Sequence, residues 1–146
     1  MLTHAPVNHP LRPIYRGIAG VSALATIAIG AVGFVATSSH EYFKANDVKV
    51  FDLIGMNPGH ALLMIGTGVL VLLALLIGRN VDQVAMLFFG LGLMVAGTFG
   101  LAVMRTDINF LSYRMPNVIV AYVIGSLLFT AGLYIKSGRP GAEHAH

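Results

Sequence analysis

The chain has no cysteine among its 146 residues. A disulfide framework, a thiolate metal site and a cysteine nucleophile are therefore excluded. Charge is also scarce, because only 10% of the residues are charged while 56% are hydrophobic. A soluble domain of this size would lack the polar side chains that must cover its surface. These two shortages predict a protein of the membrane.

In place of polar surface, the sequence has long apolar stretches. They span residues 14–37, 59–78, 81–103 and 118–135. Each has the length of about 20 residues that an α-helix needs to cross the hydrocarbon core of a bilayer. A soluble bundle would show polar residues on its outer face, but between Ala61 and Gly78 the single polar side chain is Thr67. We predict an all-α integral membrane bundle of four transmembrane helices, forming one domain (1–146) with flexible tails at 1–12 and 137–146.

The connections between the stretches differ in length. Arg79 and Asn80 make a short turn, whereas Ser38–Pro58 and Met104–Asn117 are long enough to carry structure of their own. The pattern predicts two helix-loop-helix hairpins with longer outer loops. Because aromatic and charged residues stand side by side in these loops, we expect them to lie along the membrane surface, partly as short amphipathic helices. Ordinary solvated loops are the alternative.

A weak internal repeat follows the same division. Two glycines near the end of the first span recur near the end of the third, and a proline beside an asparagine opens the second and the fourth span. The residues are Gly30, Gly33, Gly97 and Gly100, then Asn57–Pro58 and Pro116–Asn117. Asparagine is a favoured N-cap and proline suits a first helical turn, so the dipeptides are expected to mark helix starts.

The first span follows two arginines and could be mistaken for a signal peptide. Its apolar run exceeds the roughly 7 to 15 residues of a signal-peptide core, so we expect a retained helix. Orientation depends on lysine and arginine. Five stand on the side of the chain ends and the short turn and four in the longer loops, namely Arg12, Arg16, Arg79, Lys136 and Arg139 against Lys44, Lys49, Arg105 and Arg114. We expect cytoplasmic termini, in a bacterial plasma membrane or an internal membrane continuous with it.

Glycine is concentrated within the spans. In lipid, close backbone approach through small residues supplies the packing energy between helices. We predict helix packing at Gly17, Gly20, Gly30, Gly33, Gly66, Gly90, Gly97, Gly100 and Gly125. The helix of a partner protein could use the same glycines.

Ionisable side chains are nearly absent from the spans, where they usually mark function. This argues against an ion pump, a proton relay or a transporter of charged substrates. The sequence also shows no Ser-His-carboxylate set, no paired aspartates and no HExxH motif, which predicts a noncatalytic protein. Asp82 is assigned to the short turn, and Arg16 to a helix entrance from which it can reach the lipid headgroups.

His60 is the candidate cofactor-binding residue, because it stands just inside the second span. Met64 lies one helical turn further on the same face, so the two cannot occupy opposite sides of one porphyrin. His60 could be a single axial ligand of a haem or chlorophyll, or an interfacial histidine held by hydrogen bonds. We expect no metal site and, as the first reading, no cofactor.

These residues resemble a family of uncharacterised four-helix membrane proteins of actinobacteria and cyanobacteria. The resemblance extends roughly over residues 14–134 and rests on Gly33-Phe34 and on Phe-Asp-Leu-Ile-Gly-Met-Asn-Pro-Gly-His at 51–60. Asn57, Pro58 and His60 match the family pattern, while Met64 and Val120 stand where the family commonly has histidine. The resemblance implies a four-span topology and no established activity.

Two function classes remain open. The protein could be an accessory subunit that docks on a larger respiratory or photosynthetic membrane complex. It could instead bind a haem, chlorophyll or lipid through His60, with Asn57, Tyr122 or Arg114 nearby. Transport of a neutral solute by an oligomer ranks third. The expected partners are membrane lipids and either a larger complex or further copies of the chain; no nucleic acid is expected, because the basic residues behind the net charge of +3 are spread evenly.

Overall fold

The computed structural model describes residues 6–138. Its elements are α1 (Arg12–Ala36), β1 (Lys49–Val50), β2 (Ile54–Gly55), α2 (Pro58–Ile77), α3 (Val81–Val103) and α4 (Met115–Tyr134). All four helices are long and apolar enough to cross a membrane. The predicted all-α bundle of four candidate transmembrane helices is therefore confirmed.

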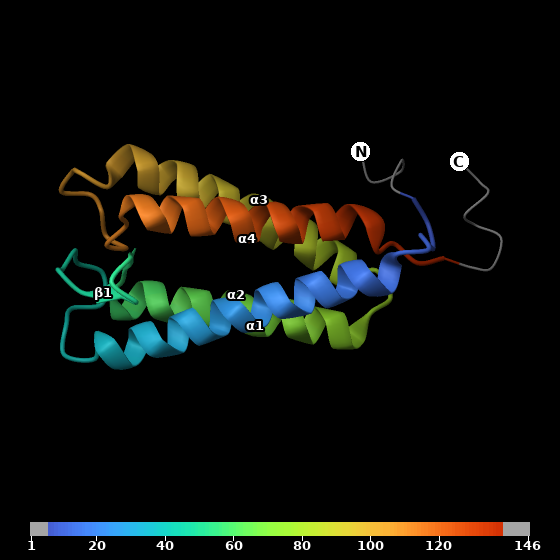
Figure 1. Cartoon of the computed structure of the whole chain (residues 1–146), viewed down its shortest axis with the longest axis horizontal. Helices are drawn as coiled ribbons and strands as arrows, with labels where there is room; N and C mark the ends of the chain where they lie inside the picture. The colour runs from blue at the N-terminus through green and yellow to red at the C-terminus, as the bar shows by residue number, and fades with distance from the viewer. Residues whose placement is uncertain (1–5, 139–146) are drawn as a thin grey trace.

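The helices run along the long axis of an elongated bundle (Figure 1). The start of α1 and the end of α4 lie together at one end, here called the terminal end. The two longer loops lie at the other, here called the loop end. Helix α1 packs mainly on α2 and α3 mainly on α4, while contacts between these two pairs are less extensive. The fold is thus two hairpins, the first of α1 and α2 and the second of α3 and α4, as predicted.

Glycine allows close approach within each hairpin. A Cβ atom added to Gly30 would come within 2.8 Å of the Ala61 carbonyl oxygen, and one added to Gly125 within 2.8 Å of the Gly90 carbonyl oxygen. Gly33, Gly90 and Gly100 are similarly closed, and Gly97 is somewhat less so, with the Ala121 Cβ atom at 3.1 Å. Gly20 makes only an ordinary contact with Leu75. Gly17 and Gly66 differ, because no atom beyond their own helix backbone lies within 4 Å. They face outward, and no other helix in the described part of the chain packs on them.

The two helix starts at the loop end differ from each other. Helix α2 begins at Pro58 as expected, and its N-cap Asn57 accepts a hydrogen bond from the His60 backbone N–H at 2.8 Å. Helix α4 begins three residues before the predicted 118, with Arg114 as N-cap. Asn117 is therefore the third residue of the helix. Both dipeptides mark helix starts as expected, but in α4 the asparagine stands at the third helical position and not at the N-cap. Its Oδ1 atom accepts a hydrogen bond from the backbone N–H of Arg114 at 3.2 Å, and the same side chain also reaches outside its own helix.

The outer loops contain no helix within 37–57 or 104–114. The expected amphipathic helices are replaced, in the first loop, by an antiparallel hairpin that pairs Val50 with Ile54. Phe51 and Asp52 both have positive φ, at 54° and 58°, a conformation that ends a right-handed helix and makes a tight turn. Val50 and Ile54 are buried at the loop end, so the hairpin covers this end of the bundle.

Candidate functional site

His60 lies in the first turn of α2 and is only 6% exposed. Its Nδ1 atom is 3.0 Å from the carbonyl oxygen of Leu111, in the loop of the second hairpin. A carbonyl can only accept, so Nδ1 must carry the hydrogen, and in the neutral imidazole Nε2 then carries the lone pair. Fixing one ring nitrogen in this way is how proteins orient a histidine that binds something through the other.

The ring of Tyr113 stacks on His60. Their centroids are 5.0 Å apart and the planes differ by 19°, while the Cδ2 and Cε2 atoms of the tyrosine ring pack against Gly100 on α3. Burial raises the pKa of the Tyr113 hydroxyl, which keeps it a neutral donor. Within residues 6–138, no hydrogen bond joins this hydroxyl or His60 Nε2 to another residue. Two stacked rings therefore offer one acceptor and one donor.

An apolar groove of about 200 Å³ begins at these two rings and runs between α2 and α3. Its walls are Leu63, Met64 and Thr67 from α2 and Phe89, Gly92, Leu93 and Ala96 from α3, with Leu111 at the loop end. A second hollow of about 320 Å³ shares Gly92, Ala96, Leu111 and Tyr113 with it and continues along α3. Together they form a long apolar surface with a polar group at one end.

Asparagines hold the loops around this groove. Asn117 accepts a hydrogen bond from Gly55 N and donates one to Gly55 O, both at 2.7 Å, which joins α4 to the first hairpin. Asn57 donates to Phe110 O at 2.7 Å, which joins α2 to the second. A small cavity of about 30 Å³ between His60, Asn117 and Thr26 is large enough for one water molecule.

Of the residues expected near His60, only Asn57 contacts it. Arg114 donates to Asn46 O at 3.2 Å instead, and the Tyr122 hydroxyl lies 2.7 Å from Thr98 Oγ1 on the outer surface. Met64 lines the groove on the same helix as His60, and the α3 wall opposite offers no side chain that ligates iron. His60 could therefore hold a haem or chlorophyll only as a single ligand. No group of three His, Cys, Asp or Glu suited to a metal occurs in residues 6–138.

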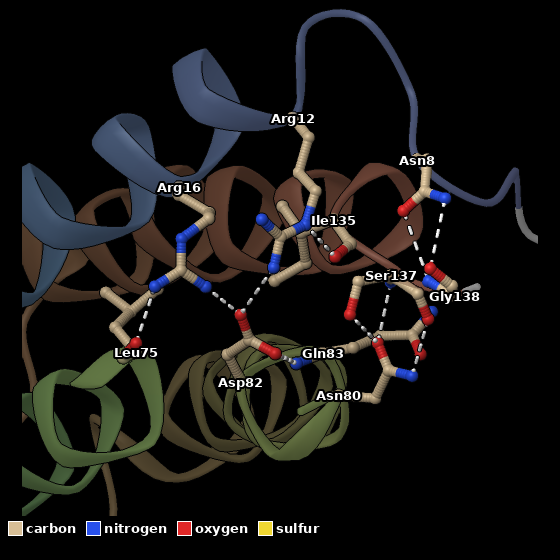
Figure 2. Close-up of polar contacts among 10 residues, drawn as sticks. All are labelled: Asn8, Arg12, Arg16, Leu75, Asn80, Asp82, Gln83, Ile135, Ser137 and Gly138. Carbon is tan, nitrogen blue, oxygen red and sulfur yellow. Dashed lines mark hydrogen bonds and ion pairs between the residues drawn. The ribbon is translucent and has the colours of Figure 1, made fainter. Parts of the chain in front are cut away.

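A second polar cluster lies at the terminal end (Figure 2). Asp82 is fully buried, and its carboxylate pairs with the guanidinium of Arg16 and, at 3.7 Å, with Arg12. Arg16 also donates to Leu75 O at the end of α2, and Arg12 donates to Ile135 O after α4 at 2.8 Å. One carboxylate and two guanidiniums therefore connect the ends of all four helices.

Sequence reasoning missed this cluster. The sequence assigns Asp82 to the short turn and Arg16 to the headgroup level, yet the two form an ion pair inside the bundle. The available signal was that both stand in the first turn or two of helices starting at the same end. The segments expected to be flexible tails also make contacts here, since Asn8 N donates to Lys136 O at 2.8 Å and Ser137 N donates to Asn80 Oδ1 at 2.7 Å. The rest of those tails, 1–5 and 139–146, lies outside the described residues.

A family model described as a domain of unknown function, DUF4383, matches residues 16–134. That segment holds nearly all of the four helices, including His60 and Asp82. The chain belongs to the DUF4383 family. The predicted membership of an uncharacterised family is therefore confirmed. No curated protein and no solved structure is significantly similar to the chain.

The two polar clusters of this DUF4383 protein differ in what they leave available for a ligand. The terminal cluster is internally paired and connects helices. The loop end combines an apolar groove with an acceptor on His60 and a donor on Tyr113, neither of which has a hydrogen-bond partner within residues 6–138. Such an arrangement can bind and orient an amphiphile.

Proposed function

We propose that this DUF4383 protein is a noncatalytic membrane protein that binds a neutral, apolar-tailed molecule between α2 and α3. The observation that carries the proposal is the position of His60, whose Nδ1 is fixed by Leu111 while its ring faces the groove. The tail would lie along the apolar walls. The head, a hydroxyl or amide, would donate to His60 Nε2 and accept from Tyr113.

The groove favours a neutral head. None of its ten lining residues carries a fixed charge, and burying an unpaired charge in such surroundings is expensive. A hydroxyl or amide needs only the two hydrogen bonds that the rings offer. This chemistry excludes a phosphate or carboxylate head from the site.

The test is to purify the protein in a mild detergent and identify co-purifying small molecules by mass spectrometry. Gly92→Leu fills the groove, and it is tolerated in the empty protein because nothing lies within 4 Å of the Gly92 side-chain position. Gly66→Leu is the matched control, since Gly66 is equally open but does not line the groove. We expect a neutral lipid-like molecule at about one per chain in the unmodified protein and in Gly66→Leu, and its loss in Gly92→Leu and His60→Gln. Retention in Gly92→Leu, or no molecule in the unmodified protein, would refute the proposal.

An absorbance spectrum of the same samples identifies a pigment. A Soret or chlorophyll band that disappears in His60→Gln would show that the occupant is a haem or chlorophyll held by the single histidine. A colourless sample that retains the molecule would assign the site to a lipid.

One observation favours the accessory-subunit role as a second candidate. Gly17 and Gly66 leave open notches on the outside of α1 and α2, where the helix of a larger complex could approach closely. After gentle solubilisation, the unmodified protein would then migrate with that complex, and Gly17→Leu or Gly66→Leu would release it. Migration as a small particle before any substitution would count against this role.

A further inference from the structure

The two hairpins make the same contacts at constant sequence offsets. A Cβ atom on Gly68 of α2 would meet the Ala23 carbonyl and the Ile27 side chain of α1. One on Gly125 of α4 would meet the Gly90 carbonyl and the Met94 side chain of α3. Gly90 and Met94 of α3 thus stand 67 residues after Ala23 and Ile27 of α1. Gly125 of α4 stands 57 residues after Gly68 of α2. In both hairpins the glycine of the second helix therefore meets a carbonyl oxygen and a side chain at equivalent positions of the first helix.

The same two offsets reproduce a second contact. A Cβ atom on Gly30 would meet the Ala61 carbonyl and the Ile65 side chain. Gly97, 67 residues after Gly30, lies against the Val118 carbonyl and the Tyr122 side chain. These two residues stand 57 positions after Ala61 and Ile65. Nearer the loops, Gly33 packs on the residue before the N-cap of α2. Gly100 packs on the residue before the N-cap of α4. The equivalence therefore includes the last turn of each first helix.

A fourth contact is preserved with its residues exchanged. In the first hairpin Gly20 of α1 faces Leu75 of α2. At the equivalent positions of the second hairpin, Leu87 of α3 faces Gly132 of α4. A large and a small residue fill the same space from opposite sides.

Burial follows the same correspondence. Ala19 and its equivalent Met86 are both fully buried, and Val21 and its equivalent Phe88 are both 68% exposed. In the second helices, Val71 and its equivalent Leu128 are both in the central core. Equivalent residues therefore face the same way, toward the other hairpin or toward lipid.

The contacts between the hairpins are reciprocal. His60 of the first hairpin bonds to Leu111 O in the loop of the second. Asn117, its equivalent at an offset of 57, bonds to Gly55 in the loop of the first. Both hairpins start at the terminal end (Figure 1), so they are related by an axis parallel to the helices.

We propose that the chain is a tandem repeat of one helix-loop-helix unit packed about an approximate two-fold axis along the bundle. The face that each unit turns toward the other is accordingly a surface that packs on a second copy of the same unit. The relation is broken at the terminal end, where Arg16 corresponds to Gln83 and Asp82 corresponds to Tyr15. The Arg16 and Asp82 ion pair therefore distinguishes the two units. Gln83 stands where the first unit has its arginine, and its side-chain Nε2 atom is buried with no hydrogen-bond partner in the described part of the chain.

The test transplants a residue pair from one unit to the other. Gly20→Leu crowds Leu75, and Leu75→Gly leaves a cavity, so each should lower the midpoint of thermal unfolding in detergent by roughly 5 to 10 °C. The double variant copies the arrangement of Leu87 and Gly132, and its midpoint should return to within about 2 °C of the original. Such a difference corresponds to no more than about 1 kcal/mol, because each kcal/mol shifts the midpoint by about 2 to 4 °C. Gly20→Leu with Leu76→Gly is the control, because Leu76 is 83% exposed and cannot make room. A double variant no more stable than Gly20→Leu alone would overturn the repeat.

A second measurement does not depend on stability, because the chain has no cysteine of its own. Cysteine pairs at the equivalent positions, Gly20→Cys with Leu75→Cys and Leu87→Cys with Gly132→Cys, should both join with a short thiol-specific crosslinker in membranes. Pairs moved by one residue to the lipid face, Val21→Cys with Leu75→Cys and Phe88→Cys with Gly132→Cys, should both stay unlinked. Linking in one hairpin and not in the other would overturn the proposal.

Discussion

Arg16 on α1 and Asp82 at the start of α3 form an ion pair between two helices that otherwise barely touch. The carboxylate is fully buried, while the Arg16 side chain is 27% exposed. The pair crosses the bundle diagonally, and Arg12 shares the same carboxylate. Removing it leaves two guanidiniums without their common anion.

We predict that Asp82→Asn lowers the free energy of unfolding by about 3 kcal/mol, the lower part of the range for breaking a buried pair, because the arginines retain some access to solvent. Thermal unfolding in detergent measures this. Asp82→Leu combined with Arg16→Met should cost less than Asp82→Asn alone, since it removes both charges of the closer pair. Arg79→Gln, at an exposed arginine of the neighbouring turn, is the control. An unchanged midpoint for Asp82→Asn would show that the pair contributes nothing.

Gly100 is required by the ring of Tyr113. A Cβ atom on Gly100 would overlap that ring, so Gly100→Ala should destabilise the protein by about 1 to 3 kcal/mol through overpacking. It should also displace the stacked His60 ring and weaken ligand retention. Gly66→Ala is the matched control, because Gly66 has open space and alanine there should be neutral or stabilising by up to about 1 kcal/mol. Equal midpoints for the two variants would contradict this account.

The positions of the helices could be predicted from hydropathy alone. The span 81–103 coincides with α3, and the other boundaries agree within three residues. Uninterrupted apolar runs carry that signal without any knowledge of neighbours. The Asn57 cap was also predictable, because a cap is a contact within four residues.

The partners of His60, Arg16 and Asn117 were not predictable, because they lie between 51 and 66 residues away. Which helix faces meet is decided by packing of the whole bundle, and apolar composition does not encode it. Asp82 shows the consequence. Its sequence position indicated a turn, while the structure places it in the interior because two arginines from another helix neutralise it.

Asn117 holds the hairpin of β1 and β2 on the end of the bundle. Asn117→Leu removes both hydrogen bonds to Gly55 and leaves buried backbone groups unpaired, at a cost of about 2 kcal/mol. Hydrogen exchange at the amides of residues 49–56 should accelerate, while exchange in the middle of α3 should not. Ser126→Ala, which loses one exposed hydroxyl contact, should leave both unchanged. Exchange of the hairpin amides in Asn117→Leu that is as slow as in the unmodified protein would contradict this assignment.

Orientation can be read with single cysteines in this cysteine-free chain. With cytoplasmic termini, Glu41→Cys at the loop end should react with an impermeant maleimide added to intact cells. Arg79→Cys at the terminal end should react only after the cells are opened. Both side chains are exposed in the structure, so access to the reagent is limited by the membrane. The reverse pattern would place the termini outside.

The first-turn position of His60 gives the groove a direction across the bilayer. Its polar end lies at the loop end and its apolar walls extend toward the membrane centre. A molecule held there would keep its head at the level of one leaflet and would be drawn from that leaflet alone. If the termini are cytoplasmic, that leaflet is the outer one, and the protein would sample the composition of only one side of its membrane.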